Sequence, residues 1–573
     1  MKRQAHALVL TAFLIPNWTR GQAPSGDYNA LEVRIRELET NLASETARVK
    51  AQDEELDRLR RAVTSLKDDL AAMRVSTGPS GRVPHGDENA PRPEVSAGQT
   101  SSANTAPPLS IRLGNALFTP FGFVDLTGIY RSKNVGSGSG TAFGAIPLSP
   151  LAIPNQTEAD SNAGLAAIGG LPETLVSAQN SRFGLRVDSL YRGTNILGYI
   201  ETDFVGSSPS DSVITRNSNP LNVRLFFVDL RRSKFEVLAG QSWSLITPNR
   251  LGVSALTADI FYTVNLDTNY QVGLIWSRSP QVRFVYHPTS KWAAGVSFEN
   301  PDQYIGKLVT LPPGLGTYGS EVDSTGAGFA QSLSSSSSSN GQVPNLIPDI
   351  VAKVARDGER YHLELGGLLR HFAVVNPTNI QHFGVTGGGI SMNGQFQLWR
   401  NFALITNTFV SEGGGRFISG LFPDLVARPD GSLSLVKAYS TLSGFEYRVG
   451  ESSVVSGYYG LAYGQKNTRI CPPTESCYST TFGGYDKPVN GYDWGFGSLD
   501  QTYENRVVSE ATLGFNHTFW QDPRYGALQF NSQFSYVQRS AWNVALPTDY
   551  IAPGLFRREH VYMMFLNLRY LLP

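Results

Sequence analysis

Residues 528–536 read LQFNSQFSY, and apolar or aromatic side chains occupy alternate positions of this stretch. Successive residues of a β-strand point to opposite faces, so Leu528, Phe530, Phe534 and Tyr536 share one face. The opposite face carries only Gln, Asn and Ser. One face therefore suits lipid and the other suits water, which is the pattern of a strand in a transmembrane β-barrel.

The same two-residue period recurs from about Thr119 to the end of the chain. It predicts about sixteen antiparallel strands. They are expected at residues 119–131, 181–190, 196–205, 222–231, 235–243, 281–288, 291–299, 348–356, 360–371, 382–398, 401–411, 435–449, 454–464, 506–519, 527–539 and 560–571. An even count returns both ends of the barrel to one side of the membrane, and eighteen strands is the alternative count.

Long and short connections alternate along these strands. The long ones include 132–180, 244–280 and 300–347, and the short ones include 191–195 and 232–234. Bacterial outer-membrane barrels show this asymmetry, because their periplasmic turns are short and their extracellular loops are long. A soluble β-sandwich also alternates apolar and polar residues, but it does not predict this regular order of connections.

The apolar runs of the chain are too short for a transmembrane helix. A chain that crosses lipid must satisfy every backbone N–H and C=O internally, and only helices and closed barrels do so. Aromatic residues make up 11% of the chain and charged residues only 17%, as expected for half-polar strands with aromatic girdles. The net charge is zero, so no charge excess points to nucleic acid. We therefore predict an all-β transmembrane barrel over residues 109–573, in a Gram-negative outer membrane.

Three segments precede the barrel. Residues 1–23 predict a secretory signal peptide, because Lys2 and Arg3 precede a short apolar stretch that ends in a small-x-small cleavage site; an uncleaved membrane anchor is the alternative. Residues 24–75 repeat apolar side chains at heptad spacing and predict an α-helical coiled coil, with a solvated helix lying on the barrel as the alternative. Residues 76–108 are rich in Pro, Gly, Ser, Thr and Asn and predict a flexible linker.

Four motifs of the barrel region, together with this order of segments, carry a resemblance to a known family. They are FGFVD (121–125), SRFGLR (181–186), GQSWS (240–244) and the closing NLRYLLP (567–573). The chain resembles the DcaP-like trimeric porins of Gram-negative outer membranes over nearly its whole length. The resemblance implies a sixteen-stranded homotrimeric diffusion channel with its N-terminal coiled coil in the periplasm. The family includes uptake of small anionic solutes such as dicarboxylates.

The long connection 244–280 is the candidate constriction of this channel. A sixteen-stranded barrel is wide enough to leave an aqueous lumen, and a loop folded into that lumen would set the limiting size. Unlike the Ser/Gly-rich loops, this connection carries apolar residues that need a packing site, among them Leu256, Ile260, Phe261 and Trp276. The alternative is an external loop that buries these side chains at a trimer contact.

Six arginines fall on the expected lumen-facing side of their strands and are candidate pore-lining residues. They are Arg182, Arg186, Arg224, Arg283, Arg370 and Arg569. A guanidinium group holds a carboxylate or phosphate through paired hydrogen bonds, so charged rings of this kind would favour anionic solutes. Glu201, Asp203 and Glu364 share the same side, so the alternative is that the arginines pair with acids across the wall.

The sequence predicts no catalytic, cofactor or metal site. The histidines are scattered and no nucleophile motif accompanies them, which argues against a barrel enzyme. A structural envelope tether, with the barrel as anchor and a periplasmic partner for the coil, is the second function class. Cys471 and Cys477 are the only cysteines, and they predict a disulfide in one external loop because the compartment is oxidising. The expected partners are outer-membrane lipid, small hydrophilic solutes and further copies of the chain.

Overall fold

The computed structural model describes most of the barrel region and little of the segment before it. The described residues are 50, 61, 109–135, 138–146, 171–205, 219–261, 264–302, 347–376, 381–427, 433–465, 503–544 and 558–573. Of the predicted coiled coil only Lys50 and Arg61 are described, both in helical conformation. The predicted signal peptide and linker lie outside the described residues. None of the helical segments described has the length and apolar character needed to cross a bilayer.

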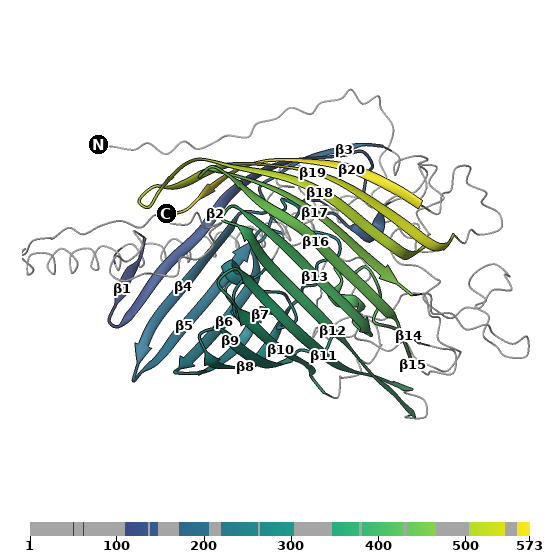
Figure 1. Ribbon diagram of the computed structural model, residues 1–573, viewed down its shortest axis with the longest axis horizontal. Helices are drawn as coiled ribbons and strands as arrows, with labels where there is room; N and C mark the ends of the chain where they lie inside the picture. Colours follow the sequence, from purple (N-terminus) through teal and green to yellow (C-terminus); the bar gives the residue numbers. More distant parts are fainter. Residues whose placement is uncertain are drawn as a thin grey trace, which may run out of the picture. The chain divides into compact units, whose positions relative to one another are not determined.

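Sixteen antiparallel strands form one closed barrel (Figure 1). Each barrel strand pairs with the next one along the chain, and β20 pairs with β2 to close the ring. The barrel strands are β2 (Ala116–Arg131), β4 (Arg182–Tyr191), β5 (Thr194–Asp203), β6 (Asn222–Arg232), β7 (Phe235–Trp243), β8 (Arg278–Thr289), β9 (Trp292–Glu299), β10 (Asp349–Asp357), β11 (Tyr361–Asn376), β12 (Gln381–Trp399), β13 (Phe402–Glu412), β16 (Lys437–Val449), β17 (Ser453–Gly464), β18 (Tyr503–Asp522), β19 (Gly526–Val544) and β20 (Arg558–Leu571). The predicted count of sixteen is confirmed, and the alternative of eighteen is not.

Several short elements were not expected from the alternating pattern. They are β1 (Ile111–Leu113), β3 (Glu173–Ser177), the hairpin strands β14 (Leu425–Ala427) and β15 (Leu433–Leu435), and the 3₁₀ helices η1 (Phe143–Ala145), η3 (Thr257–Asp259) and η4 (Gly415–Phe417). Both β3 and β4 pair with β2, at its two ends, so they act as one interrupted strand. At the interruption the Asp125 N–H donates to the Ser181 hydroxyl at 3.0 Å, which replaces a backbone acceptor.

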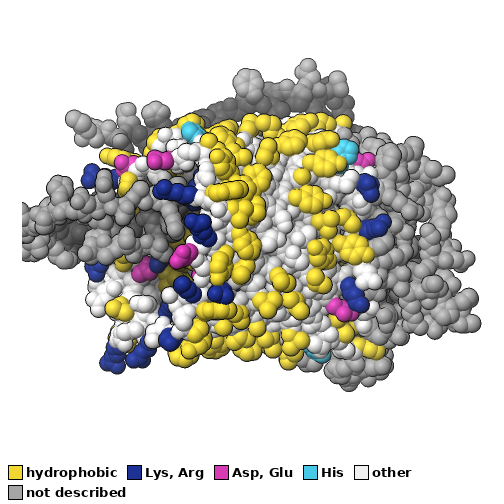
Figure 2. Space-filling model, viewed as in Figure 1, with side chains coloured by type: hydrophobic (Ala, Val, Ile, Leu, Met, Phe, Trp, Pro, Cys, Tyr) yellow, Lys and Arg dark blue, Asp and Glu magenta, His cyan; other side chains and the backbone are white. Residues whose placement is uncertain are grey.

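The two faces of the barrel wall differ as the period predicts. Along β2, Val124, Leu126 and Tyr130 are 46–53% exposed, whereas Asp125 and Thr127 between them are 1% and 3% exposed. Figure 2 shows hydrophobic side chains over the outer wall, with Lys and Arg gathered near its two margins. Polar and charged side chains therefore face the inside of the barrel, and apolar side chains face outward. A soluble protein has the opposite arrangement.

Candidate functional site

The connection between β7 and β8, here called the inner loop (residues 244–277), lies inside the barrel. Its side chains Ile246, Val272 and Ile275 are fully buried. They belong to one apolar cluster with inward-facing residues of distant strands, including Val351 of β10 and Val508 of β18. The apolar residues that distinguished this connection from the other loops in the sequence therefore pack against the inner wall of the barrel.

The wall supplies side-chain acceptors for the backbone N–H groups of the inner loop. The donor and acceptor pairs are Leu245 N and Glu299 Oε1 (2.8 Å), Asn249 N and Glu364 Oε1 (3.1 Å), Gly252 N and Asp357 Oδ2 (3.1 Å), Val264 N and the Tyr458 hydroxyl (3.3 Å), Leu266 N and Gln533 Oε1, and Val272 N and Glu510 Oε2 (2.9 Å). A buried N–H without a partner costs about as much as a lost hydrogen bond. These six inward-facing side chains, four of which are carboxylates, thus hold the loop across the lumen.

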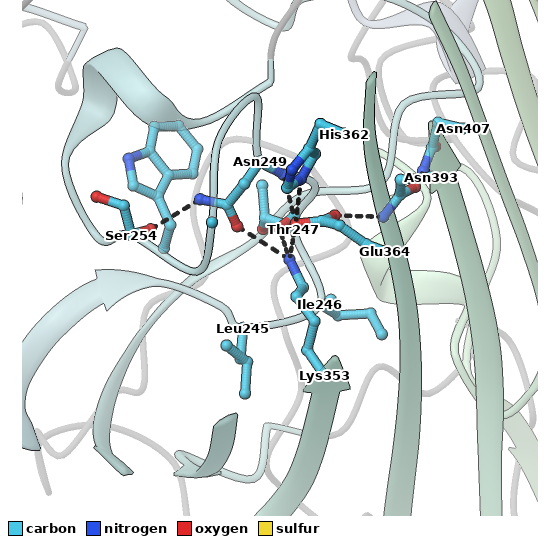
Figure 3. Close-up of polar contacts among 12 residues, drawn as sticks. Leu245, Ile246, Thr247, Asn249, Ser254, Lys353, His362, Glu364, Asn393 and Asn407 are labelled. Carbon is cyan, nitrogen blue, oxygen red and sulfur yellow. Dashed lines mark hydrogen bonds and ion pairs between the residues drawn. The ribbon is translucent and has the colours of Figure 1, made fainter. Parts of the chain in front are cut away.

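A buried lysine fixes the first part of the loop to β10 and β11 (Figure 3). The Lys353 ammonium donates to the Thr247 carbonyl at 2.6 Å, to Asn249 Oδ1 at 3.0 Å and to Glu364 Oε1 at 3.1 Å. Glu364 also accepts from Asn393 Nδ2 at 2.8 Å. Both members of the Lys353–Glu364 ion pair are fully buried. Glu364 was expected on the same side as the arginines, as a possible partner for them; it pairs instead with Lys353, and His362 Nε2 lies 3.3 Å from the same carboxylate.

Two further segments, each from a long connection between strands, contact the inner loop. In the segment 138–146, the Thr141 N–H donates to the Asp267 carboxylate at 3.0 Å, and burial raises the pKa of that carboxyl. In the segment 413–424, the Phe417 carbonyl accepts from Trp276 N at 3.1 Å. Neither segment was expected to fold inward from its sequence, and both narrow the space around the inner loop.

The six candidate arginines all lie on the inner face, in two groups that differ in exposure. The side chains of Arg182, Arg186 and Arg569 are 11%, 26% and 21% exposed. Those of Arg224, Arg283 and Arg370 are buried beneath neighbouring segments. The first group, on β4 and β20, is therefore the more exposed one on the inner face.

Most of these arginines have carboxylate partners. The ion pairs are Arg224 with Glu201 (2.8 Å) and Asp203, Arg370 with Asp349 (2.9 Å) and Asp424 (2.8 Å), Arg186 with Asp188 (2.7 Å), Arg569 with Asp125 (2.8 Å), and Arg182 with Glu201 at the longer distance of 3.9 Å. Arg283 instead donates to Gln281 Oε1 and to the Trp243 carbonyl. Pairing with acids across the wall, the alternative raised by the sequence, thus applies to Glu201 and Asp203.

A further arginine was missed because its position fell in the expected loop. Arg278 begins β8, and its guanidinium lies 5.6 Å from the Trp243 ring centroid and 5.7 Å from that of Trp276. No carboxylate among the described residues pairs with it. Burial opposes ionisation of the nearby Tyr270 hydroxyl, but Arg224, Arg182 and Arg278 together lower its pKa. Three arginines therefore act together on this hydroxyl group.

A cavity of about 710 Å³ lies below the inner loop, toward the short-turn end of the barrel. Its walls are the inner faces of β4–β10 and the underside of loop residues 251–259. Arg186, Asp188, Asp229 and Asp259 are among its lining residues. Burial raises the pKa of the Asp259 carboxyl, although Ser254 and Arg186 oppose the shift. The cavity is therefore lined by charged side chains of both signs together with apolar ones.

Comparison with known proteins gives the fold a precedent. No protein-family model and no curated protein matches the chain. Among solved structures, the outer membrane channel DcaP of Acinetobacter baumannii matches with a TM-score of 0.54 and 13% sequence identity, over 80% of this chain and 98% of that chain. The chain has the DcaP porin fold. An anion-selective porin from Comamonas acidovorans is also similar, with a TM-score of 0.41 and 14% identity over 80% of this chain and 100% of that chain.

The DcaP fold was expected from the four motifs, and the resemblance is confirmed at the level of the fold. The disulfide prediction is separate from the fold. Cys471 and Cys477 fall outside the described residues, so their disulfide stays a prediction. In the part of the chain that the structure describes, no group of three or more His, Cys, Asp and Glu side chains is arranged to hold a metal ion.

Proposed function

We propose that this protein is an outer-membrane porin, a water-filled channel for the passive diffusion of small hydrophilic solutes. The observation that carries the proposal is a closed barrel of sixteen strands with an apolar outer face and a polar inner face, crossed by a loop that leaves a cavity. A wall of this kind is stable in lipid and keeps water inside. An envelope tether would need the anchor but not the polar lumen.

We further propose that the channel prefers anions of the dicarboxylate class. Arg182, Arg186 and Arg569 are accessible on its inner face, and Arg182 Nε has no hydrogen-bond partner among the described residues. The ring of Phe123 lies 4.3 Å from the Arg569 guanidinium and 5.6 Å from that of Arg182, which fixes the two groups in the same part of the inner face. Adjacent fixed guanidinium groups suit a solute that carries two carboxylates.

Single-channel recording in planar bilayers tests the porin proposal. We expect purified, folded protein to insert as a homotrimer and to close in three equal conductance steps, because each barrel encloses its own lumen. Folded protein that gives no conductance would overturn the porin proposal and favour the envelope tether.

We also propose that residues 1–23 are a cleaved signal peptide and that residues 24–75 form a periplasmic coiled coil separated from the barrel by a linker. Deleting residues 24–75 should leave the barrel able to fold and insert, since the closed ring is made of strands that lie between Ala116 and Leu571. Heat-modifiable migration in gels measures the folded fraction. Loss of the folded band in the truncated protein would show that the coil is required for assembly.

A further inference from the structure

Two glycines meet where the inner loop touches the far wall of the barrel. A Cβ built on Gly460 of β17 would lie 1.7 Å from the carbonyl oxygen of Val272 in the loop. A Cβ built on Gly273 would lie 2.1 Å from the Thr441 carbonyl oxygen, and Gly273 has φ of +91°. Backbone therefore packs directly on backbone here, and neither position has room for a side chain.

Neighbouring contacts hold this crossing point in place. The Val272 N–H donates to Glu510 Oε2 at 2.9 Å, and Gln271 Nε2 donates to the Glu510 carbonyl at 3.2 Å. Three residues before Gly273, the Tyr270 hydroxyl accepts from Arg224 on β6 at 3.0 Å. The segment 270–273 thus spans the lumen between β6 and the β16–β18 wall.

We propose that Gly460 and Gly273 are the size-determining residues of the channel, because they set how far the inner loop sits from the arginine-bearing wall. The inference rests on the proposed diffusion function. A methyl group on Gly460 would force the loop to withdraw by roughly 1.5 Å, since closely packed backbone cannot absorb the overlap. The withdrawal is directed away from β17 toward β6, where Tyr270 contacts Arg224, and we expect it to narrow the space beside Arg182, which shares the Glu201 carboxylate with Arg224.

The test compares Gly460→Ala with Gly367→Ala in the full-length protein. Gly367, on β11, is a matched control because a Cβ there meets nothing within 4 Å. We expect Gly460→Ala to lower single-channel conductance by roughly twofold. It should also slow liposome swelling more for a disaccharide than for a pentose. Gly367→Ala should match the parent protein in both measurements.

A second variant keeps the inference testable if Gly460→Ala does not fold. Glu510→Ala removes the acceptor of Val272 N without adding bulk, so the loop should move more freely, and conductance should flicker and rise. A folded Gly460→Ala with parental conductance and parental size dependence would overturn the inference, as would parental traces from Glu510→Ala. A parent protein that does not conduct would overturn the proposed function instead, so the two failures are distinct.

Discussion

Replacing Arg182, Arg186 and Arg569 together with Gln is expected to abolish the anion preference of the channel. These three side chains are the accessible ones of the six inner-face candidates. Their removal weakens the positive field and also uncovers Asp125 and Asp188, their present partners. The ratio of chloride to potassium permeability should then fall by roughly threefold or more, toward cation preference.

Reversal potential under a salt gradient measures this change. The effect should shrink at high ionic strength, because the screening length falls from about 10 Å at 0.1 M to about 3 Å at 1 M. Arg356→Gln is the matched control, since Arg356 is exposed on β10 and lies over the rings of Trp292 and Tyr361. An unchanged reversal potential in the triple variant at low salt would leave a general porin whose arginines are structural.

Replacing Lys353 with Met is expected to destabilise the protein by about 3–5 kcal/mol, the usual cost of removing one partner from a buried ion pair. The substitution leaves the Glu364 carboxylate buried and also removes the donor to the Thr247 carbonyl. Adding Glu364→Gln should recover part of the loss, because the buried carboxylate then no longer depends on His362 alone for an opposite charge, while an amide oxygen can still accept from Asn249 N.

Urea-induced unfolding in detergent micelles measures this loss of stability. Lys234→Met is the control, because Lys234 is exposed in the turn between β6 and β7 and its replacement should cost less than about 0.5 kcal/mol. A Lys353→Met variant as stable as this control would show that the buried pair contributes no net stability, and that the loop is held by its other contacts.

The strands were predictable from the sequence because each one has two environments, and a period of two records them directly. The alternation around Phe534 and Tyr536, for example, places these residues on the same face of β19 in the structure. The interruption between β3 and β4 was not predictable, because it depends on a contact between Ser181 and Asp125, which lie far apart along the chain.

The interior was predictable only in part. Alternation gives the side of the wall on which a residue lies but not what covers it, so Arg370 and Arg186 looked equivalent although one is buried and the other accessible. The apolar residues of the inner loop predicted that it folds inward. Arg278 was missed because the strand was predicted to begin at residue 281, whereas β8 begins at Arg278. The roles of Glu299 and Glu510 as acceptors depend on that path and had no local signature.

The acceptors that hold the inner loop also constrain the order of assembly. They come from two groups of consecutive strands, β9–β11 and β17–β19, and these groups are far apart along the chain. These strands surround the loop only after β20 has joined β2. We therefore expect the loop to dock fully only after the ring has closed, because an open sheet does not yet bring these strands together around the loop. The inner loop is then the last part of the molecule to reach its final position, so a protease that enters the lumen should cut the loop only in assembly intermediates.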